Sequence, residues 1–342
     1  MGRTLLITGG SGYFGSILVE RAVAAGDRVR ILDLNPPAAG TDAEFVQGDV
    51  RDRAVVRSAC EGADVVLHNV AQVPLAKDRA LFESVNVGGM ANLLVAARDA
   101  GVSKLVSTSS SAVFGIPDAN PVTEGTRPKP LEAYGRAKLE AELLCREAVA
   151  TGLDVTIVRP RTILGHGRLG IMAVLFEFVA EGAPVYVLDG GHNRYQFVHA
   201  NDLADACLRA GERPGPAVYN IGSTEFGTMR ETLQALVDHA RTGSRVRSLP
   251  SAPAAAAMKV LAGLGQAPFA PYHWLLYGES LWFDTTRART ELGWEPQHSN
   301  SEMVIESYEW FLAHRGALAG STGSHHQSPV RLGLLKLLKR LP

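Results

Sequence analysis

Short apolar runs alternate with amphipathic stretches through the first half of the chain. Runs rich in β-branched residues predict strands at Thr4–Thr8, Arg28–Asp33, Glu44–Gln47, Val65–Asn69, Lys104–Ser109 and Asp154–Arg159. Between them, helical periodicity predicts helices at Ser16–Ala25, Ala54–Cys60, Phe82–Asp99 and Tyr134–Ala150. Alternation of strands and helices is typical of the α/β class, and it predicts a doubly wound parallel sheet.

The pattern loosens after Pro160, where strands become shorter and helices less regular. Strands are predicted at Gln196–His199 and Ala217–Ile221, and helices at Leu169–Glu181, Asp202–Ala210, Thr228–His239 and Ser301–Ala313. The Ala-, Gly- and Pro-rich stretch Leu249–Pro271 receives no assignment. This part of the chain therefore predicts a smaller α+β unit behind the parallel sheet.

The end of the chain has a different composition. Gly316–Pro329 is rich in Gly, Ser and His and predicts a flexible linker. Within Val330–Pro342, leucines recur on one helical face and Lys and Arg fall on the other, which predicts a basic amphipathic helix. Such a helix is too short to span a bilayer but can lie on an anionic membrane surface. Docking on the protein body is the alternative.

Composition and charge narrow the class of protein. A formal net charge of −1 argues against a nucleic-acid surface, and 46% apolar residues suffice for a sizeable core. Cys60, Cys145 and Cys207 lie far apart in sequence, which predicts free buried thiols and neither a disulfide nor a metal site. We expect no signal peptide and no membrane span. A cytoplasmic protein is predicted, held at the inner face of the membrane if the basic tail binds lipid.

The first predicted strand runs directly into glycines. Gly9, Gly12 and Gly15 have a GxxGxxG spacing, and a helix is predicted to start near Tyr13. Glycine permits a tight turn and close approach of a pyrophosphate, which the helix N-terminus attracts. Asp33 ends the next strand, where a carboxylate can bind the adenosine ribose hydroxyls and repel a 2′-phosphate. These residues predict a dinucleotide site that prefers NAD to NADP.

A second motif contains residue types that are used in general acid/base catalysis. Tyr134 and Lys138 are four residues apart on a predicted helix and share one face. A nearby ammonium should lower the pKa of the phenol toward neutrality, as general acid/base catalysis requires. The strand Lys104–Ser109 ends in a serine cluster, and a hydroxyl there can hold a substrate oxygen beside the phenol.

The chain contains the motifs TGGSGYFG, the GDV at Gly48–Val50, SSSAVFG and YGRAK. Through them it resembles the extended short-chain dehydrogenase/reductase superfamily, that is, the NAD-dependent epimerase/dehydratase family. The late stretch Phe283–Pro296 is similar to a C-terminal signature of that family. The resemblance implies a Rossmann NAD-binding domain at residues 1–160, to which the chain returns near 196–222. It also implies a mainly substrate-binding domain at 161–315.

The resemblance also implies roles for single residues. The catalytic set is Ser110, Tyr134 and Lys138, with Ser109 and Ser111 as the neighbouring alternatives for the serine. Lys138 should also hold the nicotinamide ribose, and Asn86 should be structural. The predicted cofactor contacts are Gly9, Gly12, Tyr13, Phe14, Gly15, Asp33, Asp49, Val50, Asn69, Val70, Ala71, Tyr134, Lys138 and Pro160. A homodimer through Phe82–Asp99 and Tyr134–Ala150 is expected on the same basis.

Positions outside the catalytic motifs bear on the substrate class. Nucleotide-sugar enzymes of the family usually have Asn at the position of Thr162 and Arg at that of Tyr195, although Arg194 is adjacent. "RPRTILG" and "HNRYQFVHANDLADA" are similar to the 3β-hydroxysteroid-dehydrogenase-like branch, which acts on alcohols and ketones of apolar skeletons. The predicted substrate contacts are Ser110, Ser111, Thr162, Arg194 and Tyr195.

We therefore predict an NAD-dependent oxidoreductase acting on a secondary alcohol or ketone of an apolar or lipid-linked small molecule. A nucleotide-sugar 4-epimerase that keeps NAD bound is the main alternative. A cofactor-binding protein without catalysis is a third possibility, which the intact Ser/Tyr/Lys set disfavours. No metal site is predicted, and His192 and His199 are expected to be structural.

Overall fold

The computed structural model describes residues 2–72, 79–170, 172–254, 256, 260 and 277–318. Its main feature is a seven-stranded parallel sheet with the strand order β10-β6-β5-β4-β1-β2-β3. The strands are β1 (Thr4–Thr8), β2 (Arg28–Asp33), β3 (Glu44–Gln47), β4 (Val65–His68), β5 (Lys104–Thr108), β6 (Val155–Pro160) and β10 (Ala217–Ile221). The strand order reverses between β1 and β4, so the predicted doubly wound Rossmann-type sheet is confirmed.

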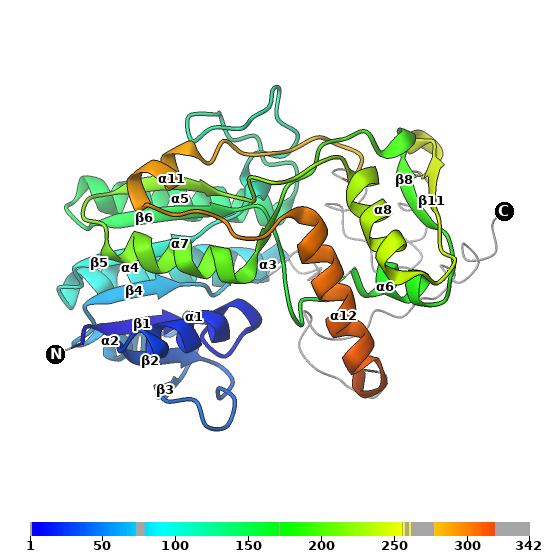
Figure 1. Ribbon diagram of the computed structural model, residues 1–342. Helices are drawn as coiled ribbons and strands as arrows, with labels where there is room; N and C mark the ends of the chain where they lie inside the picture. Colours follow the sequence, from blue (N-terminus) through cyan, green and yellow to red (C-terminus); the bar gives the residue numbers. More distant parts are fainter. Residues whose placement is uncertain are drawn as a thin grey trace.

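Helices cover both faces of this sheet (Figure 1). One face carries α1 (Tyr13–Ala24) and α7 (Ala200–Glu212), with α11 (Thr286–Leu292) beside them. The other face carries α2 (Arg53–Cys60), α4 (Gly89–Asp99) and α5 (Ala133–Ala150). Because both faces are buried, the strands are apolar at consecutive positions and do not alternate with polar residues.

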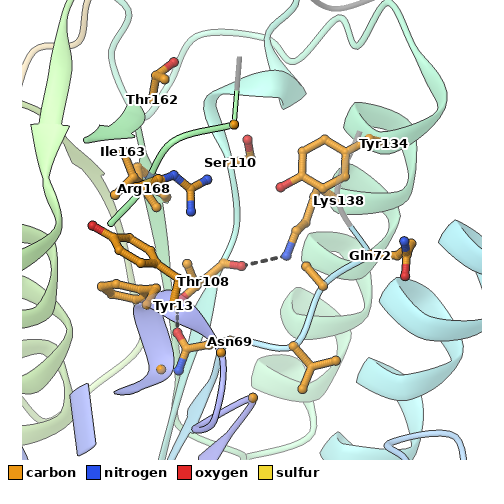
Figure 2. A pocket seen from close by; sticks show the side chains of 18 of the residues that line it. Tyr13, Asn69, Gln72, Thr108, Ser110, Tyr134, Lys138, Thr162, Ile163 and Arg168 are labelled. Carbon is orange, nitrogen blue, oxygen red and sulfur yellow. Dashed lines mark hydrogen bonds between the residues drawn. The ribbon is translucent and has the colours of Figure 1, made fainter. Parts of the chain in front are cut away.

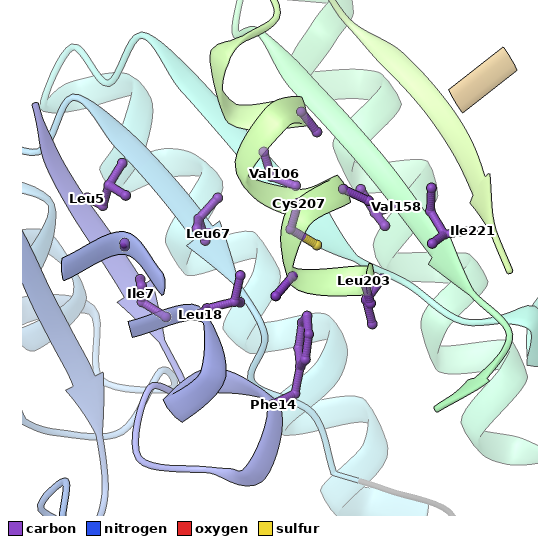
Figure 3. Close-up of a cluster of buried hydrophobic side chains, with 14 of the residues drawn as sticks. Leu5, Ile7, Phe14, Leu18, Leu67, Val106, Val158, Leu203, Cys207 and Ile221 are labelled. Atoms are coloured by element: carbon purple, nitrogen blue, oxygen red, sulfur yellow. The ribbon is translucent and has the colours of Figure 1, made fainter. Parts of the chain in front are cut away.

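Two hydrophobic clusters therefore sandwich the sheet. Leu5 and Ile7 of β1 point into the cluster under α1 and α7, whereas Leu6 points into the opposite one. Figure 3 shows the first cluster, where Leu18 of α1 and Leu203 of α7 meet the strands. This packing holds the start of α1 rigidly against the end of β1, where the glycine turn lies.

A smaller lobe lies to the right in Figure 1 and has its own core. It contains α6 (Met172–Ala180), α8 (Met229–Ala240) and α12 (Asn300–Leu318), together with two short parallel pairs. These pairs join β8 (Val185–Leu188) to β11 (Val246–Leu249) and β7 (Thr162–Leu164) to β9 (Phe197–His199). The predicted smaller C-terminal α+β part is thus present.

Several elements differ from the sequence-based expectation. The strands β7, β8 and β11 and the helix α11 were not predicted, because three- or four-residue strands and a seven-residue helix carry too little periodicity. The region predicted as one helix over Phe82–Asp99 is a π-helical stretch, Phe82–Gly88, that continues into α4; α3 (Arg79–Leu81) precedes it. Helix α6 begins at Met172, not Leu169, since Gly170 has a φ of +45° that interrupts helical geometry.

The helix predicted over Ser301–Ala313 extends to Leu318, so the first residues of the predicted linker Gly316–Pro329 are helical. Arg315 explains the extension, because its guanidinium binds both carboxylate oxygens of Glu177 on α6, at 3.1 and 2.5 Å. The rest of the linker and the whole tail Val330–Pro342 lie outside the described residues. Within the residues described, no helix combines the length and apolarity needed to cross a membrane.

Candidate active site

A cavity of about 720 Å³ opens where the carboxyl ends of β1, β2, β4, β5 and β6 face the smaller lobe. This is the edge at which ligands of open α/β sheets bind. The structure brings every predicted cofactor contact to this cavity: Gly9, Gly12, Tyr13, Phe14, Gly15, Asp33, Asp49, Val50, Asn69, Val70, Ala71, Tyr134, Lys138 and Pro160. Residues from six separate segments of the chain thus converge on one site.

In the glycine turn, no side chain of Gly9, Gly12 or Gly15 separates the backbone from the cavity. Gly9 has a φ of +74°, a conformation that side chains disfavour, and a Cβ at Gly15 would lie 1.9 Å from the carbonyl oxygen of Gly9. Helix α1 follows at once, and its N-cap Gly12 offers no side-chain cap. The first N–H groups of α1 therefore lack an internal partner and can bind an anion. This cradle fits the diphosphate of a dinucleotide.

Asp33 lies at the end of β2 beside this turn. Its carboxylate accepts the backbone N–H groups of Ser11 and Asn35, each at 3.1 Å, which fixes it on the cavity wall. That position suits the hydroxyls of an adenosine ribose. Further along the wall, Asp49 pairs with Arg51 at 2.6 Å, and the hydrogen bonds from Arg51 lower the pKa of that carboxyl.

The loop after β4 is held by amide side chains. Asn69 accepts a hydrogen bond from the Thr108 hydroxyl at 2.6 Å, which ties the ends of β4 and β5 together. Asn86 accepts the N–H of Gln72 at 2.7 Å and donates to the Gln72 carbonyl at 3.2 Å. The geometry agrees with a structural role for Asn86, since both its hydrogen bonds go to the backbone of the loop that lines the cavity.

Tyr134 and Ser110 face each other inside the cavity (Figure 2). Tyr134 stands in the first turn of α5, which Glu132 caps by accepting the N–H groups of Tyr134 and Gly135. Burial raises the pKa of the Tyr134 phenol, while a hydrogen bond with Ser110 and the charge of Arg168 lower it. Burial is the largest effect, so the phenol holds its proton at neutral pH.

Lys138 was predicted to lower the pKa of the Tyr134 phenol, but it is not among the groups that do so in this structure. Its Nζ donates to the Thr108 carbonyl at 2.9 Å, and the charge that lowers the Tyr134 pKa comes from Arg168. Burial lowers the pKa of Lys138 itself to about 8. Lys138 alone therefore does not bring the phenol pKa toward neutrality, because burial outweighs the neighbouring charges of the chain.

The serine cluster separates into distinct roles. Ser109 is buried and donates to Glu142 at 2.6 Å, and Glu142 in turn pairs with Arg159 at 2.6 and 2.8 Å. Ser110 accepts the N–H of Ala112 at 3.1 Å and keeps its hydroxyl proton for the Tyr134 side. Ser111 also lines the cavity. The geometry favours Ser110 over Ser109 as the serine beside the phenol.

The substrate end of the cavity contains two of the predicted outer contacts. Thr162 and Tyr195 line it, and their hydroxyls lie 2.9 Å apart. Arg194 does not reach the cavity: it is exposed, and its guanidinium stacks over Phe226 and Trp282 at 4.9 and 4.8 Å. Arg194 and Tyr195 are neighbours in an extended segment, so their side chains leave the chain in opposite directions.

Sequence reasoning missed two arginines of the cavity, Arg161 and Arg168. Figure 2 shows Arg168 between Tyr13 and the Ser110–Tyr134 pair, and its guanidinium lies 5.4 Å from the Tyr13 ring. Arg161 adjoins Pro160 at the end of β6, and this adjacency was a usable signal. Arg168 stands in an irregular loop, where no pattern marks it.

The remaining lining of the substrate end is largely apolar and comes from both lobes. Its members are Leu81, Val85, Ile163, Leu169, Met172, Leu175, Phe197, Met229, Leu233, Tyr277 and Val304. Apolar walls with a few polar groups are typical of sites for small organic ligands.

Near the cavity, His199, His298 and Glu306 gather with ligand atoms within 4.8 Å of one another. The Nδ1 of His199 accepts the N–H of Asn201, so the neutral ring carries its proton on Nε2, 3.1 Å from Glu306. Burial lowers the pKa of His199 to about 3, which keeps the ring neutral. A ring nitrogen that carries a proton cannot bind a metal. The cluster is consistent with the predicted structural role of His199. His192 is exposed and does not line the cavity.

Comparisons with known proteins agree with this architecture. Residues 5–222 match the model of a family described as NAD dependent epimerase/dehydratase family. An uncharacterised protein of Sinorhizobium fredii is 52% identical over 98% of this chain and 85% of its own length. A 4-hydroxy-2-methyl-3-oxo-4-farnesyl-3,4-dihydroquinoline-1-oxide ketoreductase of Stigmatella aurantiaca is 29% identical, over 84% of this chain and 90% of its own.

Among solved structures, a UDP-glucose 4-epimerase of Stenotrophomonas maltophila, with bound NAD and formylated UDP-arabinopyranose, superposes with a TM-score of 0.76. It is 25% identical and is matched over 92% of this chain and 99% of its own. The similar proteins therefore include both a UDP-glucose 4-epimerase and a ketoreductase.

Proposed function

The chain belongs to the NAD-dependent epimerase/dehydratase family, and on that premise we propose that it is an oxidoreductase of secondary alcohols or ketones on an apolar skeleton. Its cofactor is NAD. The observation that carries the proposal is the apolar substrate end of the cavity, which adjoins Ser110 and Tyr134. The finer assignments, to the 3β-hydroxysteroid-dehydrogenase-like branch and to lipid-linked substrates, are part of this proposal.

Each residue of the site would have a separate role in the reaction. The glycine turn and Asp33 would hold the dinucleotide, and Lys138 would face its nicotinamide ribose. NAD, when bound, supplies the site that accepts or donates the hydride. Ser110 would position the substrate oxygen by hydrogen bonding. The Tyr134 hydroxyl would give its proton to that oxygen in reduction, and the Tyr134 phenolate would take the proton from the alcohol in oxidation. Arg168 would stabilise the phenolate left after the proton has moved, because its charge lowers the Tyr134 pKa.

Two observations support an apolar substrate over a nucleotide sugar. The cavity wall consists mainly of aliphatic and aromatic side chains, and Arg194 points away from it. The ketoreductase of Stigmatella aurantiaca is named for a substrate with a farnesyl chain. Apolar side chains stabilise such a skeleton by removing its surface from water, and they offer little to a hydrated sugar.

The test follows NADH absorbance with secondary alcohols of increasing apolar size and NAD, and with the matching ketones and NADH. We expect turnover that improves with apolar surface and falls about 10²–10⁴-fold in Tyr134→Phe, with NAD binding unchanged. Tyr219→Phe is the matched control, because its hydroxyl binds Glu291 away from the cavity. Full activity in Tyr134→Phe would exclude Tyr134 as the proton donor.

The alternative is a nucleotide-sugar 4-epimerase, which is supported by the similarity to a UDP-glucose 4-epimerase. It would use the same Ser110, Tyr134 and Lys138. An epimerase would purify with NAD bound and convert UDP-glucose without net formation of NADH. A dehydrogenase would release its cofactor and change the absorbance.

We also propose that the tail Val330–Pro342 holds the protein at an anionic membrane surface. The support is the sequence, in which four leucines share a helical face opposite Lys336, Lys339 and Arg340. Co-sedimentation with vesicles containing anionic lipid should recover the full chain at low salt but not at high salt. The double variant Leu334→Asp/Leu338→Asp should stay in the supernatant; recovery equal to that of the wild type would exclude the tail as the anchor.

A homodimer through the helices α4 and α5 is a further part of the proposal. Two large apolar side chains are exposed on them, with Val95 at 50% and Leu143 at 52% of full exposure. Sedimentation velocity of the wild type and of Leu143→Glu tests it. We expect a dimer that the charged residue weakens, and a monomeric wild type would refute the proposal.

A further inference from the structure

Arg161 is a buried cation whose guanidinium has no hydrogen-bond partner among the described residues. It is 1% exposed, and none of its three side-chain nitrogens makes a hydrogen bond within the part of the chain that the structure describes. The guanidinium carbon lies 4.7 Å from the ring centre of Tyr195 and 5.6 Å from that of Phe283. These rings cover its faces, and the N–H groups lie in the guanidinium plane, so its edge is where an acceptor can bind.

Arg159, near the end of β6 and two residues before Arg161, provides a comparison within the same structure. Arg159 is equally buried and also stacks on an aromatic ring, Phe114, at 5.0 Å. However, its guanidinium pairs with the carboxylate of Glu142 at 2.6 and 2.8 Å. Arg161 differs from Arg159 in that no carboxylate of the described residues pairs with its guanidinium.

Among the described residues that line the cavity, none is an acid close enough to serve Arg161. The carboxylates of the cavity, Asp33 and Asp49, belong to the cofactor end, where they bind backbone N–H groups and Arg51. At the substrate end the charged side chains are Lys138, Arg161 and Arg168, all cationic. A buried charge without a partner is strongly unfavourable, so an anionic group supplied from outside would be bound tightly.

We propose that Arg161 binds an anionic oxygen group of the substrate, a carboxylate or a phosphate, while the apolar part of the substrate lies along the cavity wall. The planar edge of an arginine matches two oxygens of either group at once. Tyr195 holds the guanidinium in place, since its own hydroxyl is fixed 2.9 Å from that of Thr162. The inference rests on the proposed function, because it narrows the substrate to an amphipathic acid or phosphate ester.

Calorimetry on the full chain saturated with NAD tests the inference. The probes are 4-phenylbutyrate, its neutral analogue 4-phenylbutanol, phenyl phosphate and UDP. We expect the wild type to bind 4-phenylbutyrate or phenyl phosphate at least tenfold more tightly than 4-phenylbutanol, because a hydrogen bond to a charged group is worth about that factor. The comparison of the two acids distinguishes a carboxylate site from a phosphate site.

Arg161→Gln should abolish the preference for the anion and leave the affinity for 4-phenylbutanol unchanged. Arg194→Gln is the matched control, since Arg194 also stacks on two aromatic rings but lies outside the cavity, and it should bind as the wild type does. Arg161→Met keeps an unbranched apolar stem between the rings and should unfold at no lower temperature than the wild type in buffer of low anion content. A wild type without anion preference, or a preference that survives in Arg161→Gln, would overturn the proposal even if one variant failed to fold.

Titration with UDP distinguishes the failure of the anion site from the failure of the proposed function. Tight UDP binding that is lost in Arg161→Gln would support the anion site while rejecting an apolar alcohol as substrate. Conversely, hydride transfer on neutral ketones, together with equal affinities of the wild type for 4-phenylbutyrate, phenyl phosphate and 4-phenylbutanol, would leave the proposed function standing and reject the role of Arg161.

Discussion

Replacing Gly15 by alanine places a methyl group where the backbone of the glycine turn already lies. The new Cβ would be 1.9 Å from the carbonyl oxygen of Gly9 and 2.7 Å from the Cα of Gly10. Real Cβ atoms stay at least 3.0 Å away, so α1 and the turn must separate by about 1.1 Å. The contacts are backbone atoms, and no side-chain rotation can relieve them.

The expected cost has two parts. Overpacking of this kind destabilises a protein by about 1–3 kcal/mol, which lowers the melting temperature by about 1–4 °C in a chain of this size. Moving the first N–H groups of α1 by about 1 Å takes them out of hydrogen-bond range of a diphosphate. Since each hydrogen bond to a charged group contributes about 1.5–3 kcal/mol, NAD should bind at least tenfold more weakly.

Calorimetric titration with NAD and thermal unfolding monitored by circular dichroism measure both effects. Gly88→Ala is the control, because Gly88 has a helical φ of −62° and its added Cβ would meet nothing closer than the Glu83 oxygen at 3.8 Å. That variant should bind NAD normally. If Gly15→Ala matched the wild type in both melting temperature and NAD affinity, the assignment of this turn as the diphosphate cradle would be refuted.

In fluorescence titrations, the wild type should bind NAD more tightly than NADP. Asp33→Asn should reduce this difference in affinity, because it removes the charge that repels a 2′-phosphate. Equal affinities of the wild type for the two cofactors would contradict the prediction. Glu142→Gln removes the carboxylate that pairs with the buried Arg159, so it should lower the free energy of unfolding, measured in urea, by about 3–5 kcal/mol. Glu44→Gln is the control: Glu44 belongs to an exposed ion pair, and its replacement should change the free energy of unfolding by less than about 1 kcal/mol. Burial lowers the pKa of His68 to about 3, below its ordinary value of 6.5, so its neutral form contributes stability that is complete above pH 6.5 and is lost as the pH falls toward 3. Melting temperatures should therefore fall across that range and fall less in His68→Gln, while the exposed His166→Gln should follow the wild type.

The sequence by itself was sufficient for the parallel sheet, the glycine turn and the cofactor end of the cavity. These features depend on local patterns: apolar runs of strand length, a GxxGxxG spacing and an acid at the end of the next strand. Asp33 and Gly15 lie on segments whose course follows from those patterns. Parallel strands bring their carboxyl ends to one edge, so residues that follow them meet without further information.

Only the tertiary structure decided the substrate end and the electrostatics. Arg194 was predicted to contact substrate and points outward, whereas Arg168 reaches Tyr134 from an irregular loop. Tyr134 and Lys138 both line the cavity, as their spacing predicted, but in the chain alone the pKa of the phenol is raised, because burial outweighs the neighbouring charges. Desolvation and the convergence of distant loops depend on how the whole chain packs. A periodicity of a few residues carries no record of either. The sequence therefore predicted which residues would line the cavity, but not the environment that sets their pKa values.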